Sequence, residues 1–249
     1  MTATEIETED DLDLALLRRL AQRVAAASAA IAAAGPRSLV SADEEHTLRR
    51  LIRVRAGGLR APALVRIWRE LVAEARAAQA PVTLALCAGA DPGRAVDHAR
   101  LSFGSARLAL QPQPEAALAA ARAGAVAILP LDAGKPWWGR LLAEPALQVF
   151  AALPCLAQLG DTTALAVAQT APEPTGADQT FWVTDAPGPA SGVLAALARD
   201  GVAGEPLAEA GGLKLFALVG FYQAHDPRLA RAPGRLSGVI GAAPTPLDV

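Results

Sequence analysis

The sequence predicts a multi-domain protein: an all-α three-helix unit, then an α/β lobe, then a small α+β unit. Residues 10–80 hold apolar residues at helical spacing and no strand signal, residues 81–170 alternate strand and helix patterns, and a turn-rich break at 171–179 leads into a second mixed region at 178–249. A chain of 249 residues that is 52% hydrophobic and 19% charged can bury the cores that this arrangement needs.

Three helices are predicted in the N-terminal region. The first covers 11–34 and stops at the Gly-Pro pair that contains Pro36. The second covers 41–55, and the third covers 62–79, where Pro62 suits the first helical turn. A unit this thin buries little surface, so we expect it to pair with a second copy of itself as a homodimer.

Strand and helix patterns then alternate. The strands are PVTLALCAG, ARLALQP and AVAILPL, and the helices between them are PGRAVDHARLSFG and PEAALAAARAG. This alternation predicts a parallel α/β lobe. Two further apolar strands are expected near 147–153 and 163–169, with a short helix in GKPWWGRLL before them.

The C-terminal region predicts a small α+β unit. Its pattern over 180–223 gives a strand, a loop, a helix and then further strands. The final segment, SGVIGAAPTPLDV, is expected to form an edge strand.

Composition excludes several classes of protein. The net charge of -2 is not the positive charge that a nucleic-acid-binding protein carries. The acidic first residues lack the basic segment and the apolar segment that a signal peptide has, so we expect no signal peptide. No uncharged apolar run is long enough to span a membrane. Cys87 and Cys155 form no motif, so we expect free thiols in a reducing compartment, the cytoplasm, rather than a disulfide.

Motifs for metal or triad chemistry are absent from the sequence. His46, His98 and His225 lack ligand spacing, so we predict neither a metal nor a cofactor. The segment GADPG at 89–93 joins a strand to a helix start. Backbone amides at such a junction can hold an anion, but without a G-x-G-x-x-G pattern a plain connecting loop is the favoured interpretation.

Each helix of the first unit carries one polar residue on its apolar face. Arg23 follows Leu16 and Leu20, so its side chain either reaches out to solvent or meets an anion. Glu44 either caps the second helix together with Ser41 or faces inward. Gln79 is either the frayed end of the third helix or points at something polar. If all three face inward, they line a small polar pocket.

These helices resemble the all-helical chorismate mutase family. The segments that carry the resemblance are LLRRLAQRVAAAS, ADEEHTLRRLI and ALVRIWRELVAEARAAQ. The resemblance implies a homodimer of interlocked helices that converts chorismate to prephenate without a cofactor, in the biosynthesis of phenylalanine and tyrosine. Such a reaction needs cations that clamp two carboxylates and fixed donors at the breaking ether bond.

By this resemblance, Arg23 matches the carboxylate-binding arginine of the first helix, and Glu44 matches the glutamate near the start of the second. Gln79 matches the glutamine that donates toward the ether oxygen. The resemblance therefore implies that Arg23 and Gln79 are catalytic and that Arg23, Glu44 and Gln79 bind the substrate. Arg37, just beyond the Gly-Pro pair, is expected to substitute for a missing cation.

Four positions depart from that family. Its lysine late in the first helix aligns with Ala34, the arginine given by the partner subunit aligns near Ile6, a serine aligns with Ala75, and an aspartate falls near Val40. Loss of one oxyanion-type donor typically costs about 10²–10³ in rate.

The rest of the chain resembles a shortened prephenate dehydratase lobe followed by an ACT-like region. The T-R-F motif of the dehydratases reads Thr163, Ala164 and Leu165 here, so no dehydratase activity is expected. DAPGPASGVLAAL and LKLFALVGFYQAHDPRL, within 180–246, resemble the loop, helix and strand of an ACT domain.

The sequence leaves three functions open. The first is a chorismate mutase. The second is a catalytically inactive relative that binds a metabolite or a partner protein of the same pathway. The third is a dimerisation bundle with no chemistry of its own. We expect neither a nucleic acid nor a membrane as a partner.

Overall fold

The computed structural model describes residues 9–34, 39, 42–55, 57–79, 81–132 and 134–249. The helices are α1 (Glu9–Ala34), α2 (Ala42–Val54), α3 (Ala61–Ala77), α4 (Pro92–Phe103), α5 (Pro114–Arg122), α6 (Ala190–Arg199) and α7 (Pro227–Ala230), with 3₁₀ helices η1 (Trp137–Ala143) and η2 (Ala157–Leu159). The strands are β1 (Thr83–Cys87), β2 (Arg107–Gln111), β3 (Val126–Pro130), β4 (Gln148–Leu153), β5 (Ala164–Ala168), β6 (Asp178–Thr184), β7 (Gly204–Ala210), β8 (Leu213–Val219) and β9 (Ser237–Pro244).

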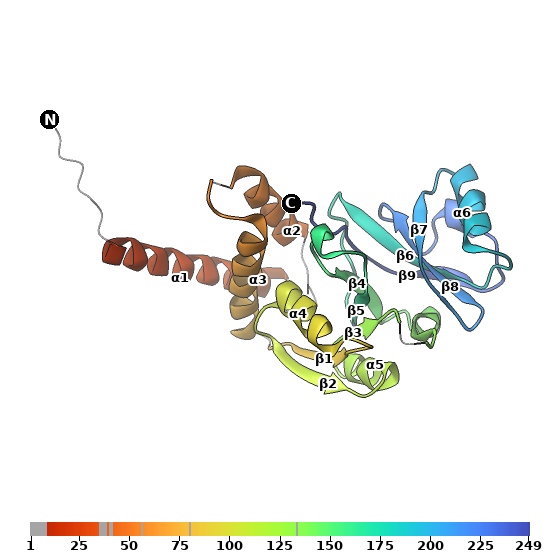
Figure 1. Ribbon diagram of the computed structural model, residues 1–249, viewed down its shortest axis with the longest axis horizontal. Coiled ribbons are helices and arrows are strands. Elements are labelled where there is room, and N and C mark those ends of the chain that lie inside the picture. Colours follow the sequence, from red (N-terminus) through yellow and green to blue (C-terminus); the bar gives the residue numbers. More distant parts are fainter. Residues whose placement is uncertain (1–8, 35–38, 40–41, 56, 80, 133) are drawn as a thin grey trace.

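The predicted N-terminal helices are confirmed as α1, α2 and α3. Helix α1 extends away from the rest of the chain as an arm (Figure 1). Its C-terminal half packs on α3 through Ala27 and Ile31, which surround the fully buried Ala75. In its N-terminal half, four leucines are between 51% and 63% exposed: Leu12, Leu14, Leu16 and Leu17.

Helices α2 and α3 dock on the rest of the chain through a shared apolar cluster. Leu48 and Val65 are fully buried in it, beside Leu101 of α4 and Leu247 near the C-terminus. Figure 1 shows the C-terminal end of the chain next to α2. The helical unit is therefore fixed to the sheet from two sides.

The described strands form one nine-stranded sheet in the order β2-β1-β3-β5-β4-β9-β6-β8-β7. Strand β1 pairs in parallel with β2 on one side and with β3 on the other. Helix α4 contributes Ala99 to one face of these strands, and α5 contributes Leu118 to the opposite face. The alternation predicted for residues 81–131 is confirmed.

The prediction of a wholly parallel lobe is wrong for β4 and β5. Strand β5 pairs antiparallel with both β3 and β4. The chain from Leu153 to Ala164 holds only the short η2 and a few turns. It is too short for the crossover helix that a parallel neighbour requires, so the chain reverses direction.

The prediction of a C-terminal edge strand is also wrong. Strand β9 lies inside the sheet, between β4 and β6, and the edges are β2 and β7. Gly241 has a φ of +144°, and a Cβ at this residue would collide with the backbone of Val149 on β4. Because Gly241 has no side chain, β4 can lie close to β9. This contact joins the strands of the α/β region, β1 to β5, to those of the C-terminal region, β6 to β9, in one sheet.

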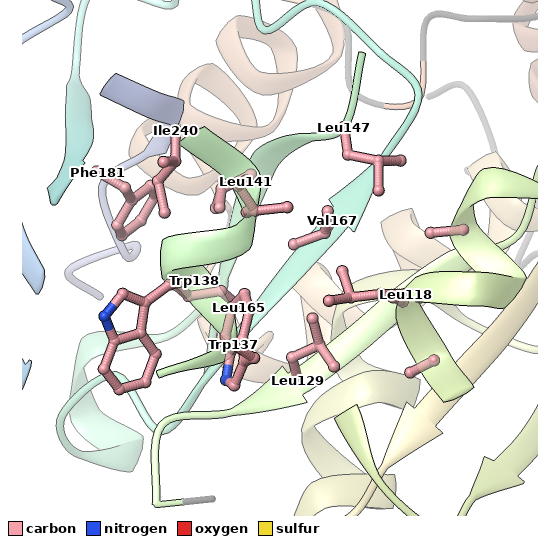
Figure 2. Packing of buried hydrophobic residues seen from close by; sticks show 14 of the residues in the cluster. Leu118, Leu129, Trp137, Trp138, Leu141, Leu147, Leu165, Val167, Phe181 and Ile240 are labelled. Carbon is pink, nitrogen blue, oxygen red and sulfur yellow. The ribbon is translucent and has the colours of Figure 1, made fainter. Parts of the chain in front are cut away.

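The largest apolar cluster lies on the α5 side of the sheet. Trp137, Trp138, Leu129, Leu165 and Val167 belong to this cluster, and Figure 2 shows Trp137 between Leu165 and Leu129. The indole Nε1 of Trp137 donates to the carbonyl oxygen of Pro130 at 2.8 Å. The short helix predicted in GKPWWGRLL is η1, which inserts both tryptophans into this core.

Both cysteine thiols are free; Cys87 is buried and Cys155 is partly buried. Among the helices of the described residues, none combines the length and the apolar character that a membrane span requires.

Candidate functional site

Two arginines on one face of α3 meet two glutamates at the start of α2. Arg69 and Arg76 are seven residues apart, which is two helical turns, so they point the same way. The Nη2 atom of Arg76 lies 3.2 Å from Oε1 of Glu44. The Nη2 atom of Arg69 lies 3.0 Å from Oε2 of Glu45. These two ion pairs fix α2 against α3.

Glu45 is the most deeply buried of the four charged side chains, with 1% exposure. Its second carboxylate oxygen lies 3.2 Å from Nε of Arg49. Arg49 also donates from Nη2 to the carbonyl oxygen of Thr245, at 2.7 Å. Glu45 therefore shares its single negative charge between two arginines and connects α2, α3 and the C-terminal end of the chain.

A cavity of about 260 Å³ lies where α2 and α3 meet the sheet. We call it the arginine cavity. Its charged and polar lining consists of Glu44, Arg69, Arg76, Ser102, Ser105 and Arg107. Its apolar wall includes Val72, Val82, Leu84, Phe103 and Val126. This volume is slightly below the range of about 300–1,000 Å³ for small-molecule sites.

The charges around this cavity favour an anion. Burial lowers the pKa of Arg76, and so does the neighbouring charge of Arg69, while Glu44 opposes both effects. Burial also acts against the charge of Arg69, but the nearby carboxylates, Glu45 first, raise its pKa above the ordinary value. Both groups stay charged at neutral pH. Glu44 and Glu45 balance part of the charge of these two arginines, and Arg107 adds a third cation to the same cavity.

The predicted residues Arg23 and Gln79 lie on the α1–α3 contact. The guanidinium of Arg23 stacks over the ring of Trp68, with its carbon 4.2 Å from the ring centroid, and the residue is partly exposed. Gln79 is exposed and lies two residues beyond the end of α3. Its side-chain amide donates to Oγ of Ser28 at 2.7 Å.

The structure brings together only part of the predicted set. Glu44 lines the arginine cavity, whereas Arg23 and Gln79 line neither this cavity nor the one described below. Arg37 lies outside the described residues, and so does Ser41, the predicted capping partner of Glu44. The ion pair with Arg76 gives Glu44 a role that the capping interpretation did not include.

Sequence reasoning missed Arg69, Arg76 and Arg107. The first two have a signal in the sequence, since their spacing of seven residues places two cations on one helical face. Their partners could not be identified in this way, because Glu44 and Glu45 lie on another helix. Arg107 reaches the cavity from β2, and its position depends on the sheet register.

A second cavity, of about 470 Å³, lies beyond the carboxyl ends of β1 and β3. We call it the switch-point cavity. The segment 89–93, predicted as a loop or an anion cradle, forms part of its wall. The protein's own carboxylates use the amides there: Ala90 N donates to Asp132 Oδ2 at 3.3 Å, and Arg94 N donates to Asp91 Oδ1 at 3.0 Å. An external anion therefore has no free cradle at these groups.

No group of three or more histidine, cysteine, aspartate or glutamate side chains is placed to hold a metal ion within the part of the chain that the structure describes. His46 contacts the carbonyl oxygen of Thr175 through Nε2 at 2.6 Å. This contact holds α2 against the segment before β6, and it occupies the Nε2 atom of His46.

No family model matches the chain, and no curated protein matches it. One similar solved structure is described as "GqqA, a novel type of quorum quenching acylases"; it has 20% identity and a TM-score of 0.43, covering 66% of this chain and 95% of that one. Another is a prephenate dehydratase from Arthrobacter aurescens in complex with L-Phe, with 14% identity and a TM-score of 0.41, covering 66% of this chain and 90% of that one. Both TM-scores are below 0.5, so neither likeness is used to infer an activity.

Proposed function

We propose that this protein binds chorismate, a cyclic dicarboxylate, in the arginine cavity and rearranges it to prephenate. The observation that carries the proposal is that Arg69, Arg76 and Arg107 line one cavity whose wall is otherwise largely apolar. Cations suit the carboxylates, and the apolar wall, with the ring of Phe103, suits the body of a cyclic molecule. The resemblance of the three helices to the helical chorismate mutases supports the same substrate.

The arrangement fits the chemistry of a one-substrate rearrangement. Arginines at separate points of the wall can hold two carboxylates and thereby keep the substrate in its compact, reactive conformer. A guanidinium or the Ser102 hydroxyl near the breaking ether bond would stabilise the negative charge that develops on its oxygen. No proton has to be transferred, and no cofactor takes part.

We further propose that the chain works as a homodimer through α1. Leu16 and Leu20 continue the face on which Ala27 and Ile31 pack against α3, since all four follow helical spacing. In one protomer Leu16 is 56% exposed, and it lies in the arm that extends away from the body (Figure 1). A second copy of α1 or α3 would bury this face, as in an interlocked helical dimer.

Replacing Leu16 by glutamate is expected to convert the dimer to a monomer, because the substitution places a charge in the apolar contact. Light scattering coupled to size-exclusion chromatography measures the mass. Gln22→Glu is the control, since it adds the same charge on the opposite face of α1. A Leu16→Glu variant that keeps the dimer mass, or a wild type that is already monomeric, would contradict the α1 interface.

A second candidate function is binding of the same metabolite without turnover. The observation that favours it concerns the donors expected at the ether oxygen. Ala75 has no hydroxyl and is fully buried under α1, and the amide of Gln79 already donates to Ser28. If the cavity supplies the clamps but no donor at the breaking bond, the protein holds chorismate and leaves it unchanged.

One pair of measurements separates these functions. Loss of chorismate is followed by absorbance with purified protein, and binding is followed by calorimetry under the same conditions. Turnover that Arg76→Ala loses supports the mutase. Saturable binding without turnover supports the second candidate, and the absence of both excludes chorismate as the ligand. The same assays on Arg23→Ala and Gln79→Ala test the site that the resemblance implies.

We propose that residues 81–170 are a degenerate dehydratase-like lobe, that residues 178–249 are an ACT-like unit, and that the protein acts in the cytoplasm, where both thiols stay reduced. Thr163 remains at the wall of the switch-point cavity, followed by the small and apolar Ala164 and Leu165. With prephenate as substrate, we expect no phenylpyruvate to form. Its appearance in an absorbance assay would overturn the proposal of a degenerate lobe.

A further inference from the structure

The switch-point cavity lies where the topology of the sheet favours a ligand. From β1 the chain crosses to β2 on one side, and it returns to β3 on the other side of β1. Ligands of open α/β sheets bind beyond the carboxyl ends of the strands at such a reversal of strand order. The cavity of about 470 Å³ is at this position, and β7 closes it with Leu207 and Glu209.

The charges at the rim of this cavity are mainly acidic. Asp91, Asp132 and Glu209 contribute carboxylates, and Arg94 contributes a cation. The Glu209 carboxylate also pairs with Nζ of Lys214 at 3.4 Å, so its charge is partly balanced within the protein. The Arg94 guanidinium donates to the carbonyl oxygen of Leu159 at 3.1 Å, so part of its hydrogen-bonding capacity is already used. With the amides at 90 and 94 held by the two aspartates, this opening repels an anion and attracts a cation.

His98 is an independent sign of a ligand. It lines the cavity, is only 7% exposed and makes no hydrogen bond to any residue that the structure describes. Burial lowers its pKa, and the neighbouring charge of Arg94 acts in the same direction, so the ring is neutral at pH 7. The ring nitrogens of His98 are not among the buried polar atoms without a partner in the described residues, so they are open to the cavity, where a ligand or water can satisfy them.

The walls define the rest of the ligand. Leu131, Leu153 and Leu207 present apolar surface from three separate parts of the fold. We infer that the switch-point cavity binds a small primary amine with an apolar body, with Asp91 and Asp132 as counter-ions for the ammonium group and His98 as a further hydrogen-bond partner. This site is separate from the arginine cavity and does not depend on the proposed function.

The test uses the full-length protein and three probes of matched shape: benzylamine, benzyl alcohol and benzoate. Binding is measured by calorimetry, and amide chemical shifts locate it. We expect benzylamine to bind saturably with shifts around residues 88–98, and benzyl alcohol and benzoate to bind more weakly or not at all. Absence of saturable benzylamine binding below about 10 mM would overturn the inference.

Variants decide whether the carboxylates recognise the amine. The double variant Asp91→Asn and Asp132→Asn is expected to weaken benzylamine binding about tenfold, since two partly exposed counter-ions are lost. Asparagine is as good a helix cap as aspartate, so α4 keeps its N-terminal cap. The double variant Asp10→Asn and Asp43→Asn, on α1 and α2 and outside the cavity, removes the same two charges and is the control for net charge. Unchanged amine affinity in the double variant, or benzoate binding as tight as that of benzylamine, would contradict the proposal.

Discussion

Replacing Glu45 by alanine is expected to lower the free energy of unfolding by about 3 kcal/mol, because one partner of a buried ion pair is removed. Glu45 is 1% exposed and forms ion pairs with both Arg49 and Arg69. Without it, two arginines at the junction of α2, α3 and the C-terminal end face each other with no carboxylate between them. Urea denaturation followed by circular dichroism measures the change.

Two further variants make this stability prediction specific. Glu45→Gln keeps the shape and the hydrogen-bonding oxygen but loses the charge, so we expect a smaller loss than with alanine. Glu74→Ala removes an exposed carboxylate from α3 and is expected to change stability by no more than about 0.5 kcal/mol. If Glu45→Ala were as stable as Glu74→Ala, the buried ion-pair cluster would have no structural importance.

Arg76→Ala is expected to weaken chorismate binding by about 10- to 100-fold, which corresponds to the loss of hydrogen bonds to a charged group. The side chain of Arg76 is 12% exposed, that of Glu44 is 15% exposed, and both residues line the arginine cavity. Removing the guanidinium deletes a clamp and leaves the carboxylate of Glu44 to repel an anionic substrate. Calorimetric titration with chorismate measures the effect.

The matched control for Arg76→Ala is Arg66→Ala. Arg66 lies on the same helix, is exposed and is outside the arginine cavity, so its loss changes the net charge equally. Arg76→Lys keeps the charge but not the planar fork, so we expect intermediate affinity. Equal chorismate affinity in Arg76→Ala and Arg66→Ala would mean that the substrate binds elsewhere.

Local patterns in the sequence predict much of the fold. The stripe that ends near Gln79, the Gly-Pro pair after α1 and the alternation from β1 to β3 each depend on residues close together in the chain. The position of β9 depends instead on the contact of Gly241 with Val149, about ninety residues earlier in the chain. Small residues at a chain end resemble an edge strand until that partner is known.

The candidate site also divides into features that nearby residues predict and features that depend on distant contacts. Glu44 was identified from its place near a helix start, and the structure places it on the wall of the arginine cavity. Arg23 stands out because it interrupts an apolar stripe, but its stacking on Trp68 arises from how α1 packs on α3. The spacing of Arg69 and Arg76 places them on one helical face, but only the docking of α3 on the sheet makes Arg76 a cavity residue.

The most direct test of the proposed substrate site is a crystal structure of the protein soaked with chorismate. We predict density for a cyclic dicarboxylate in the arginine cavity, with its carboxylates next to Arg76 and Arg107. Density beside Arg23 and Gln79 instead, with the arginine cavity empty, would contradict the proposal and favour the site that the helical resemblance implies.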